Sequence, residues 1–304
     1  MDYILSAQGL SKQYGRSKAL DNFTIHIPKG AIYGLVGRNG AGKTTLIRLL
    51  CGLQSPTTGT FTLYDIPNTS PNLSLARRRM GAVVETPALY TALSAEENLK
   101  QQYRVLGLPS FDGLAELLEL VGLGDVGKKK VRNFSLGMKQ RLGLAIALVG
   151  DPDFLILDEP TNGLDPQGII DIRELILRLN REKGITVLIS SHILDELSRL
   201  ATHYGILDRG RMVKELSARE LEATCRKCVS LTVSDTKALT RVLDGMGLDY
   251  RILSDTQADV YAQVNLSQLA LALDKEGCEL QAAREKDESL EGYFISLVGG
   301  GDHV

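Results

Sequence analysis

The stretch Gly37-Arg38-Asn39-Gly40-Ala41-Gly42-Lys43-Thr44-Thr45 decides the fold of this chain. It fits the phosphate-loop pattern, in which glycines let several backbone N–H groups point at one anion. The apolar residues 31–36 predict a buried strand before the loop, and the apolar spacing within residues 46–50 predicts a helix after it. A chance glycine-rich turn is the alternative interpretation, and the strand and helix on either side argue against it.

We expect this loop to bind the phosphates of a nucleotide. The helix that begins near Lys43 presents its positive N-terminal end to them. Lys43 adds a point charge for the β- and γ-phosphates, and the Thr44 hydroxyl can ligate Mg²⁺. The phosphate-binding residues predicted on this basis are Gly37, Asn39, Gly40, Ala41, Gly42, Lys43, Thr44 and Thr45.

The composition is that of a globular protein, since 43% of the 304 residues are hydrophobic and 24% are charged. A formal net charge of −2 provides no basic field for nucleic acid. No apolar stretch approaches the about 20 residues that span a bilayer, and Met1-Asp2-Tyr3 does not open like a secretory signal. Cys225 and Cys228 form a lone Cys-x-x-Cys, which supports zinc only weakly. The sequence thus predicts a cytosolic protein with reduced thiols.

Apolar strands alternate with helices along residues 3–216, which predicts a mostly parallel sheet covered on both faces. Ser94 and Glu97 form a capping box at the start of one of these helices. Gly37, Asp158 and His192 each follow the end of a separate apolar strand. Because ligands collect at the carboxyl ends of strands in such sheets, we expect these three positions to converge on one site.

Six motifs, taken together and in this order, resemble those of the nucleotide-binding subunit of ATP-binding-cassette (ABC) transporters. They are Tyr14 as the adenine-stacking aromatic, the phosphate loop 37–45, the signature Phe134-Ser135-Leu136-Gly137-Met138, the acidic Leu155-Ile156-Leu157-Asp158-Glu159, the turn Gly163-Leu164-Asp165 and the switch residue His192. The resemblance implies an α/β P-loop NTPase cassette over residues 1–216. Its expected parts are a mixed, mostly parallel core sheet, an antiparallel β subdomain and an inserted helical subdomain at about residues 86–150.

The resemblance also implies ATP and Mg²⁺ as ligands and assigns roles to the remaining site residues. Thr44 and Asp158 are expected to place Mg²⁺, Glu159 to activate the attacking water as a general base, and His192 to contact the γ-phosphate. Ser135 and Gly137 of one subunit are expected to close over ATP on another, with Asp165 at the seam. A helix-capping acidic pair and a surface tyrosine are the alternative interpretations of Asp158-Glu159 and Tyr14.

Two features depart from the family pattern. The usual signature Leu-Ser-Gly-Gly-Gln has Leu136 in place of its first glycine and Met138 in place of its glutamine. Glu85 stands where the family has its switch glutamine; its carboxylate can approach Mg²⁺ but cannot donate a hydrogen bond when ionised. Both variations resemble the branch that includes bacitracin- and lantibiotic-resistance exporters, which favours export of an antimicrobial peptide, a drug or a similar amphiphile.

The partners follow from the same resemblance. It implies a separate integral-membrane permease docked on the helices within residues 94–121, a homodimer or paired cassette with ATP at its interface, and a location on the inner face of the cell membrane. No nucleic-acid partner is expected. Two alternatives are a sensor cassette with little pumping and a soluble ABC-type ATPase that acts on nucleic acid or ribosomes. Long coiled-coil insertions or a second cassette, which are usual in the last class, are absent from the sequence.

Residues 217–304 predict a small accessory α+β domain. Its expected element order, βαββαβ, suggests a split-βαβ sandwich of ferredoxin-like type. Apolar residues from Leu290 to Val298 recur at helical spacing and predict a final helix. The predicted strands cover residues 228–233, 250–253, 260–264 and 278–282, and the predicted helices cover residues 236–246 and 266–275.

Overall fold

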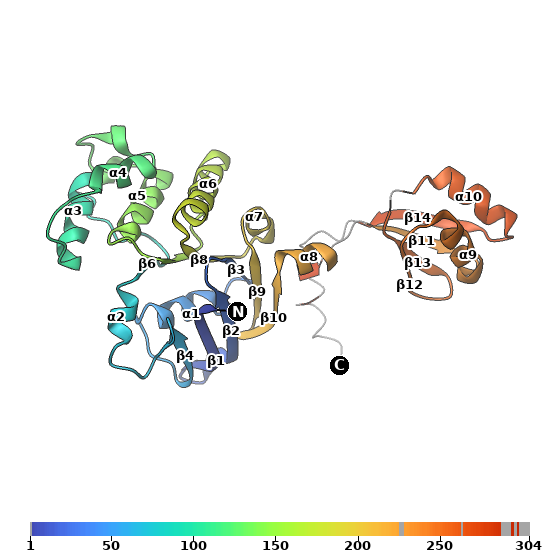
Figure 1. Cartoon of the computed structure of the whole chain (residues 1–304), viewed down its shortest axis with the longest axis horizontal. Coiled ribbons are helices and arrows are strands. Elements are labelled where there is room, and N and C mark those ends of the chain that lie inside the picture. The colour runs from blue at the N-terminus through green and yellow to red at the C-terminus, as the bar shows by residue number, and fades with distance from the viewer. Residues whose placement is uncertain (1, 225–227, 263, 287–292, 295–296, 298–304) are drawn as a thin grey trace. The chain divides into compact units, whose positions relative to one another are not determined.

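The computed structural model describes residues 2–224, 228–262, 264–286, 293–294 and 297 (Figure 1). The chain divides into two compact units, Met1–Ala218 and Arg219–Val304, so the boundary predicted after residue 216 lies close to this division. The weakly supported zinc site depends on Cys225, and the predicted final helix runs from Leu290 to Val298. These three residues lie outside the described residues. None of the helices described is long and apolar enough to cross a membrane.

The central sheet of the first unit has the strands β3 (Ile32–Val36), β6 (Met80–Val83), β7 (Phe154–Asp158), β8 (Thr186–Ser191), β9 (His203–Asp208) and β10 (Arg211–Ser217). They lie in the order β10-β9-β3-β8-β7-β6. Every neighbouring pair is parallel except β9 and β10, which follow one another in the chain and form a hairpin. All residues of β3, β7 and β8 are buried, as expected of strands covered on both faces. The mixed, mostly parallel core sheet is therefore confirmed.

A second sheet of the first unit is antiparallel. Its strands β1 (Tyr3–Tyr14), β2 (Ser17–Pro28), β4 (Thr58–Leu63) and β5 (Ile66–Pro67) lie in the order β2-β1-β4-β5. The first two strands have 12 residues each, because their cross-strand pairing continues to Tyr14 opposite Ser17. This sheet is the predicted antiparallel β subdomain.

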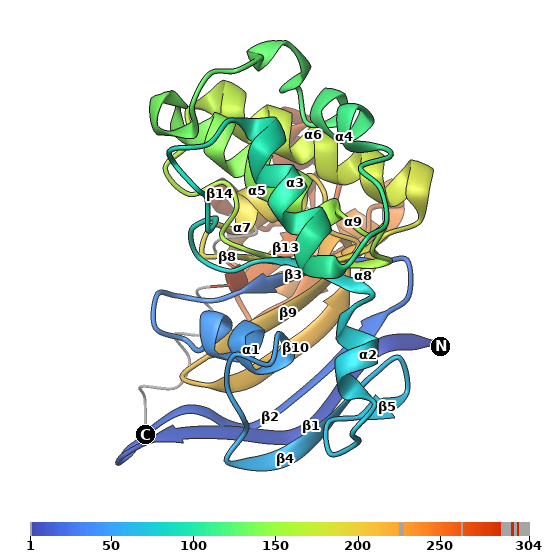
Figure 2. The same ribbon diagram turned by 90° about the vertical axis from the view of Figure 1, so that its left-hand side faces the viewer.

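Helix α1 (Lys43–Leu50) lies between the two sheets (Figure 2). Leu46, Ile47, Leu49 and Leu50 are each at most 1% exposed and belong to one hydrophobic core with residues from both sheets. Burial of several large aliphatic side chains on so short a helix stabilises its position by several kcal/mol, at roughly 1.5–3 kcal/mol for each. The phosphate loop at the N-terminus of α1 is thereby attached to a rigid part of the core.

The remaining helices of the first unit are α2 (Leu73–Arg77), α3 (Ala95–Leu106), α4 (Leu114–Leu120), α5 (Leu136–Leu148), α6 (Pro166–Lys183) and α7 (Leu194–Ser198), and 3-10 turns cover Gly124–Val126 and Val131–Asn133. Helices α3, α4 and α5 pack together as the predicted helical subdomain (Figure 1). The predicted capping box of α3 is confirmed: Glu97 N donates to Ser94 Oγ at 3.2 Å, and Ser94 N donates to Glu97 Oε2 at 2.6 Å. The Ser94 N–H and the Lys130 ammonium together lower the pKa of Glu97 to about 2.

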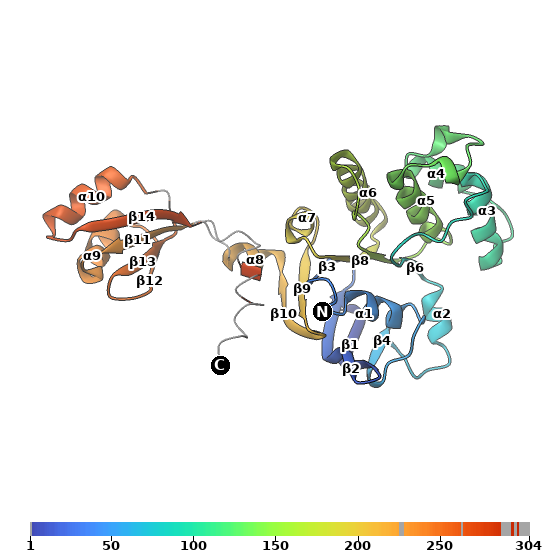
Figure 3. The ribbon, with the colours of Figure 1, turned by 180° about the vertical axis from the view of Figure 1, so that it is seen from behind.

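The second unit has the predicted order of elements (Figure 3). After α8 (Ala218–Thr224) come β11 (Cys228–Val233), α9 (Thr236–Met246), β12 (Tyr250–Ile252), β13 (Gln257–Val260), α10 (Leu266–Lys275) and β14 (Leu280–Lys286). The strands pair antiparallel in the order β12-β13-β11-β14, and α9 and α10 pack on them through a separate core. The ranges predicted for the last two strands, 260–264 and 278–282, were wrong by a few residues, because pairing with β11 sets the bounds of both. The closer ferredoxin-like likeness stays a prediction.

A close contact between β6 and α5 generates a test of the fold. A Cβ atom at Gly81 would lie 2.0 Å from the Ala147 carbonyl oxygen on α5. Gly81→Ala should therefore push the two elements apart and lower the free energy of unfolding by about 1–3 kcal/mol, measured by urea denaturation of the full chain. Ala82 is exposed, so Ala82→Ser should change this free energy by less than about 0.5 kcal/mol. A Gly81→Ala chain as stable as the parent would show that β6 and α5 do not pack closely.

Candidate functional site

The phosphate loop connects β3 to α1, in the order that the sequence predicts. At two positions of the loop there is no room for a side chain, so only glycine fits. A Cβ atom at Gly37 would lie 2.6 Å from the Leu207 carbonyl oxygen, and one at Gly42 would lie 2.5 Å from the Ala19 carbonyl oxygen. Gly42 also has φ +115°, a conformation that other residues rarely adopt. The loop therefore folds back tightly on the core before α1 begins.

Lys43 is buried inside this loop, with its side chain only 5% exposed. Its Nζ donates to the Gly37 carbonyl oxygen at 2.7 Å and to the Arg38 carbonyl oxygen at 3.3 Å. It also lies 3.2 Å from Glu159 Oε1, which comes from the end of β7. The lysine ammonium is thus held in place by the loop and shared with a carboxylate from another strand.

The acidic pair Asp158-Glu159 is held by a serine on the neighbouring strand β8. Ser190 Oγ donates to Asp158 Oδ1 at 2.6 Å and accepts a hydrogen bond from Glu159 N at 2.9 Å. The second carboxylate oxygen, Asp158 Oδ2, is buried and has no hydrogen-bond partner in the protein. Because an unpaired buried carboxylate oxygen is costly, this atom fits a cation ligand. Together with the nearby Thr44 hydroxyl it is the oxygen donor set that Mg²⁺ prefers.

Glu159 lies between two basic side chains. Its Oε1 contacts Lys43, and its Oε2 lies 3.3 Å from His192 Nδ1. Glu159 has φ +47°, which is uncommon for a residue with a β-carbon. Backbone strain of this kind persists only where the surroundings impose it, and it is enriched at active sites. Through these contacts of Glu159, the segments that follow β3, β7 and β8 meet at one edge of the sheet, where the sequence predicted that Gly37, Asp158 and His192 converge.

A cavity of about 680 Å³ opens beside these residues. Among the predicted site residues it is lined by Asn39, Gly40, Gly42, Lys43, Thr44, Thr45, Glu85, Asp158 and Glu159. Ala41 is buried in the loop, and its carbonyl oxygen accepts a hydrogen bond from Gly210 N at 2.8 Å. Leu136, Gln140, Asn162 and Gly163 also line the cavity, although the sequence did not predict them as site residues.

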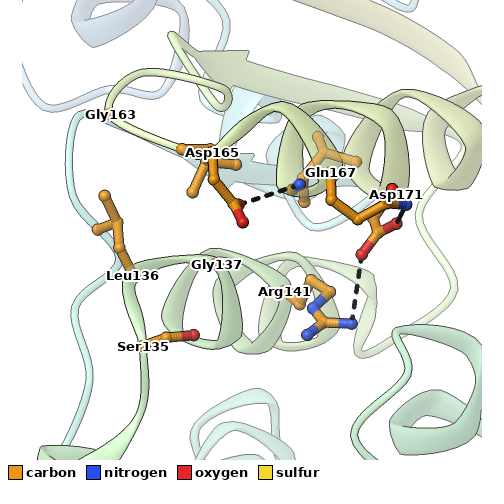
Figure 4. A pocket seen from close by; sticks show the side chains of 11 residues that line it. Ser135, Leu136, Gly137, Arg141, Gly163, Asp165, Gln167 and Asp171 are labelled. Carbon is orange, nitrogen blue, oxygen red and sulfur yellow. Dashed lines mark hydrogen bonds and ion pairs between the residues drawn. The ribbon is translucent and has the colours of Figure 1, made fainter.

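The signature residues and Asp165 lie around a different cavity, of about 350 Å³, between α5 and α6 (Figure 4). Ser135 caps α5 by accepting from Met138 N at 3.3 Å, and Asp165 caps α6 by accepting from Gly168 N at 3.1 Å. Leu136 projects toward the turn at Gly163, where an added Cβ atom would lie 3.1 Å from Leu136 Cδ2 (Figure 4). Ser135, Gly137 and Asp165 are thus gathered together, but not around the phosphate loop of their own chain.

Tyr14 and Glu85 have partners that the sequence did not predict. The Tyr14 hydroxyl donates to Gln54 Oε1, and the ring is partly exposed, with Lys12 Nζ 5.2 Å from its centroid. Tyr14 does not line the phosphate-loop cavity. Glu85 forms an ion pair with Arg48 on α1, so its carboxylate faces a fixed cation at the rim of the cavity.

Ser190 is the positioning residue that sequence reasoning missed most clearly. It is fully buried near the carboxyl end of an otherwise mostly apolar strand. A polar residue at such a position, two residues before the predicted site residue His192, is a signal that was present in the sequence. The partners of Ser190 are Asp158 and Glu159, which lie 32 and 31 residues earlier in the chain, and no local pattern identifies them.

Comparisons with known proteins agree with this geometry. A family model described as ABC transporter matches residues 20–162. The bacitracin transport ATP-binding protein BcrA of Bacillus licheniformis is 41% identical over 304 residues, which cover 99% of this chain and 99% of the relative. The lantibiotic transport ATP-binding protein SrtF of Streptococcus pyogenes is 45% identical over 212 residues, which cover 70% of this chain and 90% of the relative.

A solved structure agrees as well. The dimeric post-hydrolysis state of the ATP-binding cassette MJ0796, bound to ADP and Pi, superposes with a TM-score of 0.64 at 25% identity, over 71% of this chain and 99% of that one. The sequence match to BcrA spans both units of the chain, whereas the match to this structure covers about the length of the first unit. The chain therefore belongs to the ABC transporter family, as one of its ATP-binding, ATP-hydrolysing subunits.

Proposed function

We propose that the chain hydrolyses MgATP in the cavity between the phosphate loop and the end of β7. The observation that carries this proposal is the position of Glu159, with one carboxylate oxygen 3.2 Å from Lys43 Nζ and the other 3.3 Å from His192 Nδ1. Phosphoryl transfer to water depends mainly on positioning and on neutralising charge. A carboxylate held between a phosphate-loop lysine and a histidine is suited to both tasks.

Each residue then has a role that its contacts support. Lys43 and the N–H groups of the loop hold the β- and γ-phosphates. A phosphate oxygen competes with Glu159 Oε1 for the Lys43 ammonium, so nucleotide binding frees this carboxylate to accept a proton from the attacking water. His192 orients Glu159 through Oε2. Thr44 and the unpaired Asp158 Oδ2 would hold Mg²⁺, which would supply positive charge to the phosphate oxygens.

A second copy of the chain, or a paired cassette, completes the site in this proposal. Ser135, Gly137 and Asp165 line a cavity separate from that of Lys43, so they are free to serve the nucleotide of another subunit. The dimeric MJ0796 cassette bound to ADP and Pi supports this arrangement. ATP shared between two subunits favours their association by mass action, and hydrolysis removes that preference.

The transport role is proposed from the relatives. The bacitracin transport protein BcrA aligns with 99% of this chain, including the second unit, and SrtF is a lantibiotic transport protein. We assign this chain the task of powering export of a peptide antibiotic through a separate membrane permease. Such a partner places the chain on the inner face of the cell membrane.

The permease docks, in this proposal, on a groove of the helical subdomain. A cavity of about 440 Å³ lies there between α3, α5 and the segment after β6. Tyr90 is 61% exposed and Val105 is 77% exposed, and both line the groove. Two exposed side chains with large apolar surfaces beside the amides of Gln101 and Gln102 suit an amphipathic helix from a membrane protein.

The phosphate-loop assignment predicts the effect of Lys43→Ala. Loss of the ammonium should raise the Kd for ATP at least about tenfold, because a hydrogen bond to a charged group contributes roughly 1.5–3 kcal/mol. Isothermal titration calorimetry measures this Kd directly. Lys183→Ala removes a half-exposed lysine at the end of α6 and should leave the affinity unchanged. Unaltered ATP affinity in Lys43→Ala would argue against nucleotide binding at this loop.

The general-base assignment predicts the effect of Glu159→Gln. The variant keeps the size of the side chain but cannot accept the proton, so kcat should fall about 100-fold or more while ATP still binds. Light scattering in MgATP should show an accumulating dimer. Glu182→Gln changes an exposed residue of α6 and should hydrolyse ATP at the parent rate. Turnover at the parent rate in Glu159→Gln contradicts the role given to Glu159.

The transport proposal is tested by co-expression with a candidate permease in cells exposed to bacitracin. The chain should co-purify with the permease from membranes and raise resistance, and Lys43→Ala should abolish that resistance. Val105→Glu should weaken co-purification, whereas Leu75→Glu, at another exposed apolar residue on α2, should not. A stable complex that hydrolyses ATP while the cells accumulate the peptide as before contradicts export and favours a sensor cassette.

A further inference from the structure

We propose that Glu196, on the short helix α7, is a positioning residue for ATP hydrolysis. The proposal deepens the function proposed above and rests on it. Glu196 Oε2 accepts a hydrogen bond from Thr161 Oγ1 at 2.7 Å, and the Ser191 hydroxyl lies 3.4 Å from the same oxygen. Thr161 is 8% exposed and Ser191 is 4% exposed, so the carboxylate makes these contacts in largely buried surroundings.

The two hydroxyls belong to the two segments that carry the catalytic pair. Thr161 lies two positions after the general base Glu159, and Ser191 immediately precedes His192. Ser191 Oγ also accepts from Ile193 N at 3.0 Å, which fixes the turn on which His192 sits. One carboxylate oxygen therefore connects the turn after β7 to the end of β8, directly before His192.

This connection adds to the one that Ser190 makes. Ser190 joins the ends of β7 and β8 at Asp158 and at the Glu159 backbone, and Glu196 joins them again beyond Glu159, at Thr161. Glu159 lies between the two connections and has the uncommon φ of +47°. A single bond on one side leaves this backbone free to relax, whereas bonds on both sides hold the carboxylate toward Lys43 and His192.

The same contact reaches the predicted subunit seam. Thr161 begins the turn that leads to Asp165, and Leu164 N donates to the Thr161 carbonyl oxygen at 3.2 Å. Glu196 thus restrains both the general base and the start of the turn through Asp165. Glu196 does not line the phosphate-loop cavity, so in this proposal it acts by positioning other residues.

The test compares kcat and KM for ATP in the full chain. Glu196→Ala should lower kcat about tenfold and leave KM within twofold, because the base is misplaced while the phosphate loop is intact. Glu196→Gln keeps an acceptor oxygen for Thr161 and should retain at least half of the parent kcat. Asp195→Ala, at an exposed carboxylate of the same helix, should match the parent.

Thr161→Val supplies the second arm. It removes the hydroxyl at nearly constant volume, should lower kcat as much as Glu196→Ala does, and keeps the test decisive if Glu196→Ala does not fold. Because Glu196→Ala already removes the hydrogen bond that Thr161→Val breaks, the double variant Thr161→Val/Glu196→Ala should be no slower than Glu196→Ala alone.

Three results overturn the inference: a kcat in Glu196→Ala or Thr161→Val within twofold of the parent, a change confined to KM, or losses that multiply in the double variant. A parent chain that itself lacks MgATP turnover contradicts the proposed function instead, so the two failures are distinguishable.

Discussion

The parallel pairing of β3, β8 and β7 is the constraint on which the site depends. Val36 pairs with Ser191, and Asp158 pairs with Ser190, so the three strands end at the same level of the sheet. Because they also run in the same direction, the loop after each strand leaves the same edge. All residues of the three strands are buried, and the packing of helices on both faces prevents this edge from shifting.

Positive and negative charges at this edge of the sheet come from different segments of the chain. The phosphate loop supplies the buried Lys43 ammonium, and β7 supplies Glu159 and the unpaired Asp158 Oδ2. In the protein alone, Lys43 and Glu159 satisfy one another at 3.2 Å. In the proposed function, MgATP replaces this pairing: phosphate oxygens would contact the Lys43 ammonium, and the metal would contact the unpaired Asp158 Oδ2.

Two cavities of the first unit support the proposal that a second subunit completes the site. The phosphate-loop cavity is lined by Lys43 and Glu159, whereas Ser135, Gly137 and Asp165 line the other cavity. Leu136 and Gly163 line both, and their contact joins the signature segment to the turn that follows the general base. This packing would allow the proposed hydrolysis in one subunit to affect its contact with another.

The features that could be predicted from the sequence alone are formed by residues close together in the chain. The loop with its flanking strand and helix, the capping box at Ser94 and the acidic pair after β7 all depend on local spacing, and the motif order was sufficient to identify the family. Tertiary structure alone decided the pairing of Arg48 with Glu85 and of Thr161 with Glu196, which lie 37 and 35 residues apart, and likewise the bounds of β13 and β14. Such contacts arise where strands and helices from distant parts of the chain meet. The periodicity of one segment predicts its own secondary structure but does not show which distant segment packs against it.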